Sequence, residues 1–139
     1  MHRVLLDTNQ LVSSLLGAQG LQGQLLDAWR RRTFLLCLAP RQLEEVTAVL
    51  RRPKIARKYA ISSGDRDAFV ALLHADGLLL PDAPPAGVCR DPDDDRLLGC
   101  AAAGGVDYLV TGDADLLILG RYRDIRIVDA RAFLTILSA

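Results

Sequence analysis

Five short apolar runs recur along the chain, and longer stretches with helical spacing separate them. The runs occupy residues 3–6, 34–38, 78–80, 108–110 and 126–128. Runs of this length, with a continuous apolar body, are typical of strands buried on both faces, as in a parallel sheet covered by helices. The alternation of strands and helices therefore predicts an α/β fold, namely a three-layer α/β/α domain with a central parallel β-sheet.

Apolar residues recur every three or four positions between these runs, as on one face of a helix. Leu43, Val46 and Leu50 share such a face, and in another stretch Ser62 is a candidate N-cap and Gly77 a candidate end. The expected helices cover residues 21–32, 42–52, 62–77, 96–105 and 130–137. Prolines concentrate in residues 81–93, which we expect to form a loop across the sheet edge.

Length and charge limit the classes of protein that fit. Half of the 139 residues are apolar, which is enough for one core, so we expect a single domain over residues 1–139. Lys and Arg together number 17, as do Asp and Glu, so any nucleic-acid contact must be a local patch. Cys37 and Cys100 lie in apolar surroundings, as reduced thiols do. Asp7 interrupts the N-terminal apolar run, so we expect no signal peptide or membrane span and a cytoplasmic location.

Acidic residues follow two of the expected strands. Asp7 comes directly after the first strand, and Asp113 and Asp115 follow the run at 108–110, with Thr111 in the turn. In an open parallel sheet, ligands bind beyond the carboxyl ends of the strands. Asp7 and Asp113 therefore lie where a ligand is expected.

Further acids stand in two other segments. Four aspartates fall within residues 91–95, where a solvated loop and a helix N-terminus that favours negative charge are one interpretation. Glu44 and Glu45 are neighbours on an expected helix, so they point about 100° apart and only one can face inward. Acids gathered from four segments would repel one another unless a cation lies among them, and oxygen ligands of this kind favour Mg²⁺ or Mn²⁺.

Several motifs carry a resemblance to a known family. The sequence reads "VLLDTNQLVSSLL" at the N-terminus, "LEEVTAVLRRPK" in the middle, then "CRDPDDDRLLGCAAAGGVDYLVTGDADLL" and "IRIVDARAFL". In this order, they resemble the PIN domain over nearly the whole chain, in particular the VapC-like toxins of prokaryotic type II toxin-antitoxin systems. The resemblance implies a metal-dependent endoribonuclease whose acids come from these motifs.

The resemblance assigns roles residue by residue. It implies catalytic and metal-binding roles for the acids at Asp7, Glu45, Asp95 and Asp113, with Asp115 as a further metal or water ligand. Asp94 is the alternative to Asp95 as the third acid. The accessory positions are Thr8, Asn9, Asp94 and Thr111. The expected cofactor is Mg²⁺ or Mn²⁺, as one ion or two, and the expected products carry a 5′ phosphate and a 3′ hydroxyl.

Expected partners are an RNA substrate, a cognate antitoxin and a second copy of the chain. Cations directly after the helix that bears Glu45 could bind RNA phosphates, or they could belong to a solvated face. They are Arg51, Arg52, Lys54, Arg57 and Lys58. The alternatives to a toxin are an RNA-processing nuclease of the same fold, a metal-free RNA-binding module and a different Mg²⁺ enzyme such as a phosphatase. The RNA target and the antitoxin are open at this stage.

Overall fold

A computed structural model describes residues 1–17 and 20–139. Within them, six strands form one sheet in the order β3-β2-β1-β4-β6-β5. The strands are β1 (Arg3–Leu6), β2 (Leu35–Leu38), β3 (Leu78–Leu79), β4 (Tyr108–Val110), β5 (Arg121–Tyr122) and β6 (Ile125–Val128). All neighbouring pairs are parallel except β5 and β6, which are antiparallel. The predicted α/β fold with a mostly parallel central sheet is confirmed.

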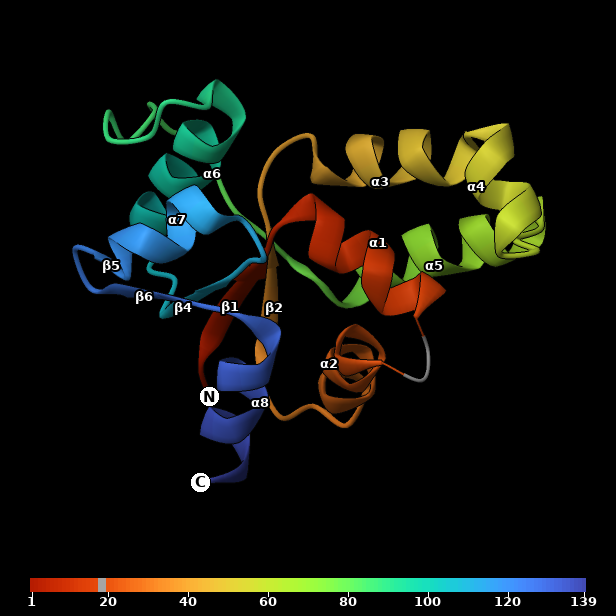
Figure 1. The fold of residues 1–139 in the computed structure, drawn as a ribbon, viewed down its shortest axis with the longest axis horizontal. Helices are drawn as coiled ribbons and strands as arrows, with labels where there is room; N and C mark the ends of the chain where they lie inside the picture. The colour runs from red at the N-terminus through yellow and green to blue at the C-terminus, as the bar shows by residue number, and fades with distance from the viewer. Residues whose placement is uncertain (18–19) are drawn as a thin grey trace.

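Helices cover both faces of this sheet (Figure 1). Their bounds are α1 (Thr8–Leu16), α2 (Leu21–Arg30), α3 (Gln42–Arg51), α4 (Pro53–Lys58), α5 (Ser63–Asp76), α6 (Pro92–Ala103), α7 (Ala114–Leu119) and α8 (Ala130–Ser138). Each expected helix is present, and α5 has the expected cap at Ser62 within a complete capping box. The helices α1, α4 and α7 and the strand β5 lie outside the elements expected from the sequence.

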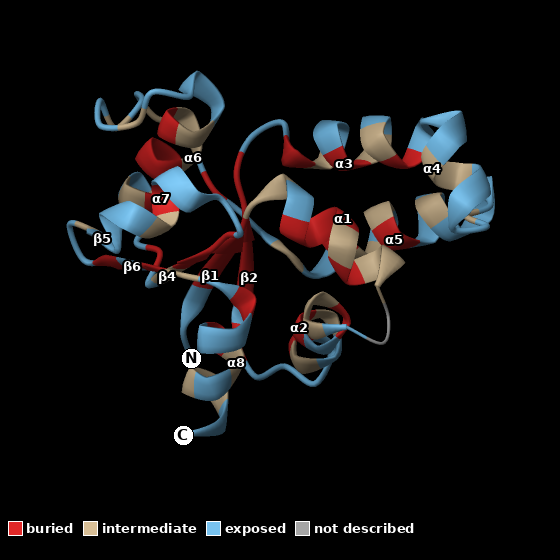
Figure 2. Ribbon diagram, in the orientation of Figure 1, coloured by how far each residue is buried: buried red, intermediate tan, exposed pale blue. Residues whose placement is uncertain are grey.

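Successive residues of the central strand β1 point to opposite faces of the sheet. Val4 and Leu6 belong to one hydrophobic cluster and Leu5, between them, to the other. Because helices cover both faces, residues 4–6, 36–38 and 109–110 of the central strands are apolar and buried, and Figure 2 shows the inner part of the sheet in red.

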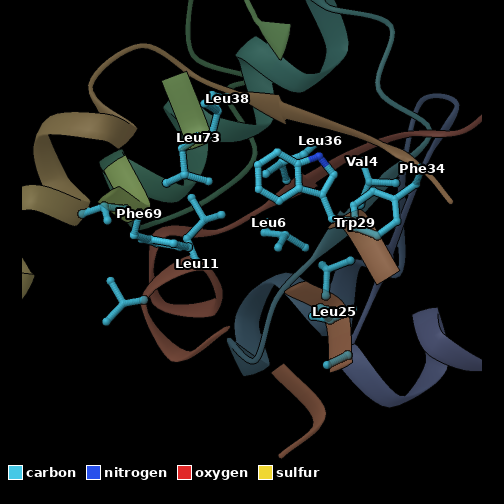
Figure 3. Packing of buried hydrophobic residues seen from close by; sticks show 14 of the residues in the cluster. Val4, Leu6, Leu11, Leu25, Trp29, Phe34, Leu36, Leu38, Phe69 and Leu73 are labelled. Carbon is cyan, nitrogen blue, oxygen red and sulfur yellow. The ribbon is translucent and has the colours of Figure 1, made fainter. Parts of the chain in front are cut away.

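The first cluster lies between the sheet and α1, α2, α3, α5 and α8. Figure 3 shows Trp29 and Leu25 of α2 beside Phe34, and Phe69 and Leu73 of α5 near Leu11 of α1. Trp29 and Phe69 are 7% and 4% exposed, so they are core residues, not platforms for stacking bases. The second cluster joins the opposite face to α6 and α7 and contains both Cys37 and Cys100. None of the described helices has the length and apolar character needed to cross a membrane.

Candidate active site

Two aspartates at adjacent strand ends cap the helices that follow. Asp7 succeeds β1, and its Oδ1 accepts a hydrogen bond from the N–H of Gln10 (2.8 Å) at the start of α1. Asp113 follows β4, and its Oδ1 accepts from the N–H groups of Asp115 (2.9 Å) and Leu116 (3.1 Å) at the start of α7. Because β1 and β4 are parallel neighbours, both carboxylates lie at the same edge of the sheet.

Thr111 links these two acids. Its hydroxyl donates to Oδ2 of Asp7 (2.5 Å) and accepts from the N–H of Asp113 (3.0 Å). Thr111 is fully buried, so its hydroxyl holds a fixed position. Burial raises the pKa of Asp7; the hydrogen bonds from Thr111 and Gln10 oppose this shift, and the charge of Asp113 adds to it.

The first turn of α6 brings a third acid to this edge. Asp91 caps the helix, since its Oδ1 accepts from the N–H groups of Asp93 (2.8 Å) and Asp94 (3.2 Å). Partial burial raises the pKa of Asp94 to about 6, and the charges of Asp113, Asp91, Asp7 and Asp93 contribute to the rise. Asp94 therefore lies within the field of the other acids.

Asp95, the acid expected from the motif, has a different position. It is 7% exposed, and its carboxylate accepts from three backbone N–H groups of the preceding loop, those of Gly87 (2.8 Å), Val88 (2.9 Å) and Cys89 (2.9 Å). These bonds hold the pKa of Asp95 below its ordinary value. Asp95 is absent from the residues that line the cleft described below, whereas Asp94 is among them. Neighbours on a helix point about 100° apart, so the two side chains face different regions.

Glu45 reaches the same edge from α3. The hydroxyl of Thr8 donates to its Oε2 (2.6 Å), which joins the start of α1 to α3. Glu45 lines the cleft, whereas Glu44 lies in a shallow groove on another side of α3. The expectation that these neighbours face apart agrees with this arrangement.

One open cleft of about 870 Å³ contains these groups. Among the expected residues, it is lined by Asp7, Thr8, Asn9, Glu45, Arg52, Asp94 and Asp113. Asp115 is exposed and lies outside the cleft lining, and it meets Asp113 through its backbone N–H. Of the cations expected to bind RNA, Arg52 lines the cleft and Arg51 lines the groove near Glu44.

The donor set fits a hard divalent cation. Asp7, Asp94, Asp113 and Glu45 supply only carboxylate oxygens, the ligands that Mg²⁺ and Mn²⁺ prefer. Burial and, to a lesser degree, the charges of neighbouring aspartates raise the pKa of Asp94, as expected where acids gather in one region. Among residues 1–17 and 20–139, no group of three or more His, Cys, Asp or Glu side chains is arranged to hold a metal ion.

Sequence patterns missed several residues of the cleft. Arg41, Asp82 and Arg96 line it, and so does Gln10, which is 8% exposed. Gln10 stands at the third position of α1 behind the Asp7 cap, where a glutamine often bonds to the N–H of the cap residue. That N–H donates instead to the carbonyl of Val110 (3.1 Å), and Oε1 of Gln10 has no partner among the described residues. The three-residue spacing between the cap residue Asp7 and Gln10 was the feature of the sequence that could have pointed to Gln10.

Comparison with known proteins identifies the family. The PIN domain matches residues 3–115, which include all the cleft residues named above. The chain belongs to the PIN domain family. A protein of Methanocaldococcus jannaschii named as uncharacterized is 28% identical over 120 residues, which cover 84% of this chain and 74% of that protein. PIN domains are generally nucleases, and they usually use divalent metals such as Mg²⁺.

Proposed function

We propose that this PIN domain is a Mg²⁺- or Mn²⁺-dependent endoribonuclease. The observation that carries the proposal is the convergence of carboxylates from four separate segments on one cleft: Asp7 after β1, Glu45 on α3, Asp94 on α6 and Asp113 after β4. In the lining of this cleft, the carboxylates outnumber the arginines. Such an arrangement is stable only with solvent or a cation among the acids.

Asp7, Asp94 and Asp113 would hold the metal, with Glu45 as a further ligand or as the group that orients water. Asp94 takes the place that the motif assigned to Asp95, because Asp94 lines the cleft and Asp95 does not. A divalent cation lowers the pKa of a bound water and neutralises charge that grows on a scissile phosphate.

The protein's own residues orient these acids. The Thr111 hydroxyl fixes one oxygen of Asp7, and the Thr8 hydroxyl fixes one oxygen of Glu45. The N–H groups at the start of α7 fix Oδ1 of Asp113. One oxygen each of Asp7, Glu45 and Asp113 is therefore held in place before a ligand arrives, which is the usual task of groups behind metal ligands.

RNA is the proposed substrate, and cleavage would leave a 5′ phosphate and a 3′ hydroxyl. The resemblance to VapC-like toxins supports a role as the toxin of a toxin-antitoxin pair, with a cognate antitoxin and a homodimer as partners in the cytoplasm. An RNA-processing nuclease of the same fold is the alternative. A small gene for a DNA-binding protein directly beside this one would favour the toxin.

Cleavage of a single-stranded RNA in the presence of Mn²⁺ tests the proposal. Asp7→Asn and Asp113→Asn should each reduce the rate by at least about a hundredfold, because loss of groups that merely orient metal ligands already costs 10–100-fold. Asp27→Asn on α2, an exposed aspartate outside the cleft, is the matched control and should cleave normally. Undiminished cleavage by both cleft variants, with wild-type folding, would overturn the assignment.

A further inference from the structure

One stripe of α3 faces the acidic cleft along its whole length. Glu45, Val49 and Arg52 recur at helical spacing on this face, and Arg41, four positions before Glu45, continues the stripe past the helix start. All four residues line the cleft. Arginines therefore flank the two ends of a helix of ten residues, about 16 Å apart along its axis, with Glu45 between them.

Arg41, at one end of this stripe, has an unfavourable backbone conformation that its surroundings enforce. Its φ is 75°, in the left-handed region that residues other than glycine rarely adopt. Gln42 maintains this turn: it is 2% exposed, its Oε1 accepts from the N–H of Ala39 (2.9 Å), and its Nε2 donates to the carbonyl of Leu6 (2.8 Å). Leu6 directly precedes Asp7. Strain of this kind persists where the surroundings enforce it, and it is common at ligand-binding sites.

Arg52 is placed by the break between α3 and α4. It is the C-cap of α3 and the N-cap of α4. Its φ of −58° and ψ of 123° correspond to the extended conformation that is favoured before a proline, here Pro53. The ion pairs among the described residues are Arg66–Asp67 and Arg96–Asp93. Arg41 and Arg52 are both exposed, and within the described ranges neither forms an ion pair.

We propose that Arg41 and Arg52 bind two different backbone phosphates of one RNA strand and align it along α3, with the acids of the cleft between the two contacts. This inference rests on the proposed function. A cleft lined by carboxylates repels a polyanion, so cations at its ends must offset that repulsion. Because the two arginines stand at opposite ends of α3, contacts to two different phosphates let one strand pass over the acids between them. Phosphate contacts fix the register of the strand without reading its sequence.

Binding of a short single-stranded RNA without metal, in an Asp113→Asn background that prevents cleavage, tests the inference. Arg41→Gly and Arg52→Gln should each raise Kd about tenfold, as expected for loss of one charged hydrogen bond. Each should also reduce the slope of log Kd against log salt by about 0.7, the value for one phosphate of a single strand. Arg131→Ala removes the same charge from α8, which Figure 1 draws at the end of the molecule away from α3, and should change neither quantity.

Arg41→Gly separates binding from folding. Glycine adopts a positive φ without strain, so this variant should melt at or above the temperature of its parent while it binds RNA more weakly. Equal Kd values and salt slopes for Arg41→Gly, Arg52→Gln and Arg131→Ala would overturn the inference, as would a parent protein that binds no RNA. If the wild type cleaves RNA but these variants bind normally, the inference fails and the nuclease proposal survives. If binding depends on both arginines but the wild type never cleaves RNA, the nuclease proposal fails and the inference about the two arginines survives.

Discussion

Asp94 and Asp95 are adjacent on α6, yet their carboxylates lie in opposite surroundings. Asp94 faces the acidic cleft, where partial burial and four neighbouring aspartates raise its pKa to about 6. Asp95 faces the loop before α6, where three backbone N–H groups lower its pKa. The first region concentrates several carboxylates in one cleft, whereas the second surrounds a single carboxylate with three hydrogen-bond donors. The proposed cation therefore fits the cleft side and not the loop side.

The difference shows that consecutive aspartates of one run can have different roles: one lines the cleft and the next binds the loop before the helix. Asp94 and Asp95 have the same chemistry and the same helix, so only the direction of each side chain separates them. The loop that Asp95 holds carries Asp82, and it leads into Asp91, and both residues line the cleft. Asp95 thus supports the shape of the cleft without entering it.

The largest effect is expected from a substitution on α6 that overlaps sterically with the loop before this helix. A Cβ on Gly99 of α6 would lie 2.1 Å from the carbonyl oxygen of Pro84, which is backbone and cannot rotate away. Gly99→Ala should destabilise the protein by about 2 kcal/mol or more, a steric cost of about 3 kcal/mol less about 1 kcal/mol of helix propensity. Chemical denaturation measures the change.

Gly64→Ala is the matched control for this prediction. Gly64 also lies in a helix, α5, and a Cβ there would be 3.6 Å from the Ser62 hydroxyl, an ordinary contact. This variant should be as stable as the wild type or slightly more so. Equal stability of the Gly99 and Gly64 variants would mean that the loop is not pressed against α6.

A smaller effect, on the affinity for Mn²⁺, is expected from a substitution on the cleft side. Thr111→Val keeps the shape of a fully buried side chain but removes the hydroxyl that donates to Asp7. Mn²⁺ affinity measured by calorimetry should fall about tenfold, as for other groups that orient metal ligands. Thr135→Val on α8, whose hydroxyl bonds to the carbonyl of Arg131, should leave the affinity unchanged. An unaltered affinity in a folded Thr111 variant would show that Asp7 needs no such support.

The apolar strands, several helices and most cleft acids follow from local patterns. The buried strands read as apolar runs, and Asp7 and Asp113 follow two of them, at the end of a parallel sheet where ligands are expected. The short elements were missed because β5 has two residues and α7 six, too few for a periodic signal.

The choice between Asp94 and Asp95 depends on long-range geometry. Three N–H groups converge on Asp95 because the loop turns back at Gly87, whose φ is 82°, and because Gly99 lets Pro84 approach α6. The motif gives the spacing of the acids along the helix but not the path of this loop. Arg41 was missed for a similar reason, since its position depends on the contact between Gln42 and Leu6.

Thermal unfolding of Asp94→Asn and Asp95→Asn, with and without millimolar Mn²⁺ near neutral pH, tests the assignment of the two aspartates most directly. A carboxyl whose pKa is raised on folding destabilises the protein above its ordinary pKa, and one whose pKa is lowered stabilises it there. Without metal, Asp94→Asn should therefore melt above the wild type and Asp95→Asn below it. Mn²⁺ should raise the melting temperature of the wild type and of Asp95→Asn by mass action, and that of Asp94→Asn much less. An Asp95 variant that loses the Mn²⁺ response beside an Asp94 variant that keeps it would contradict the account and return the third ligand to Asp95.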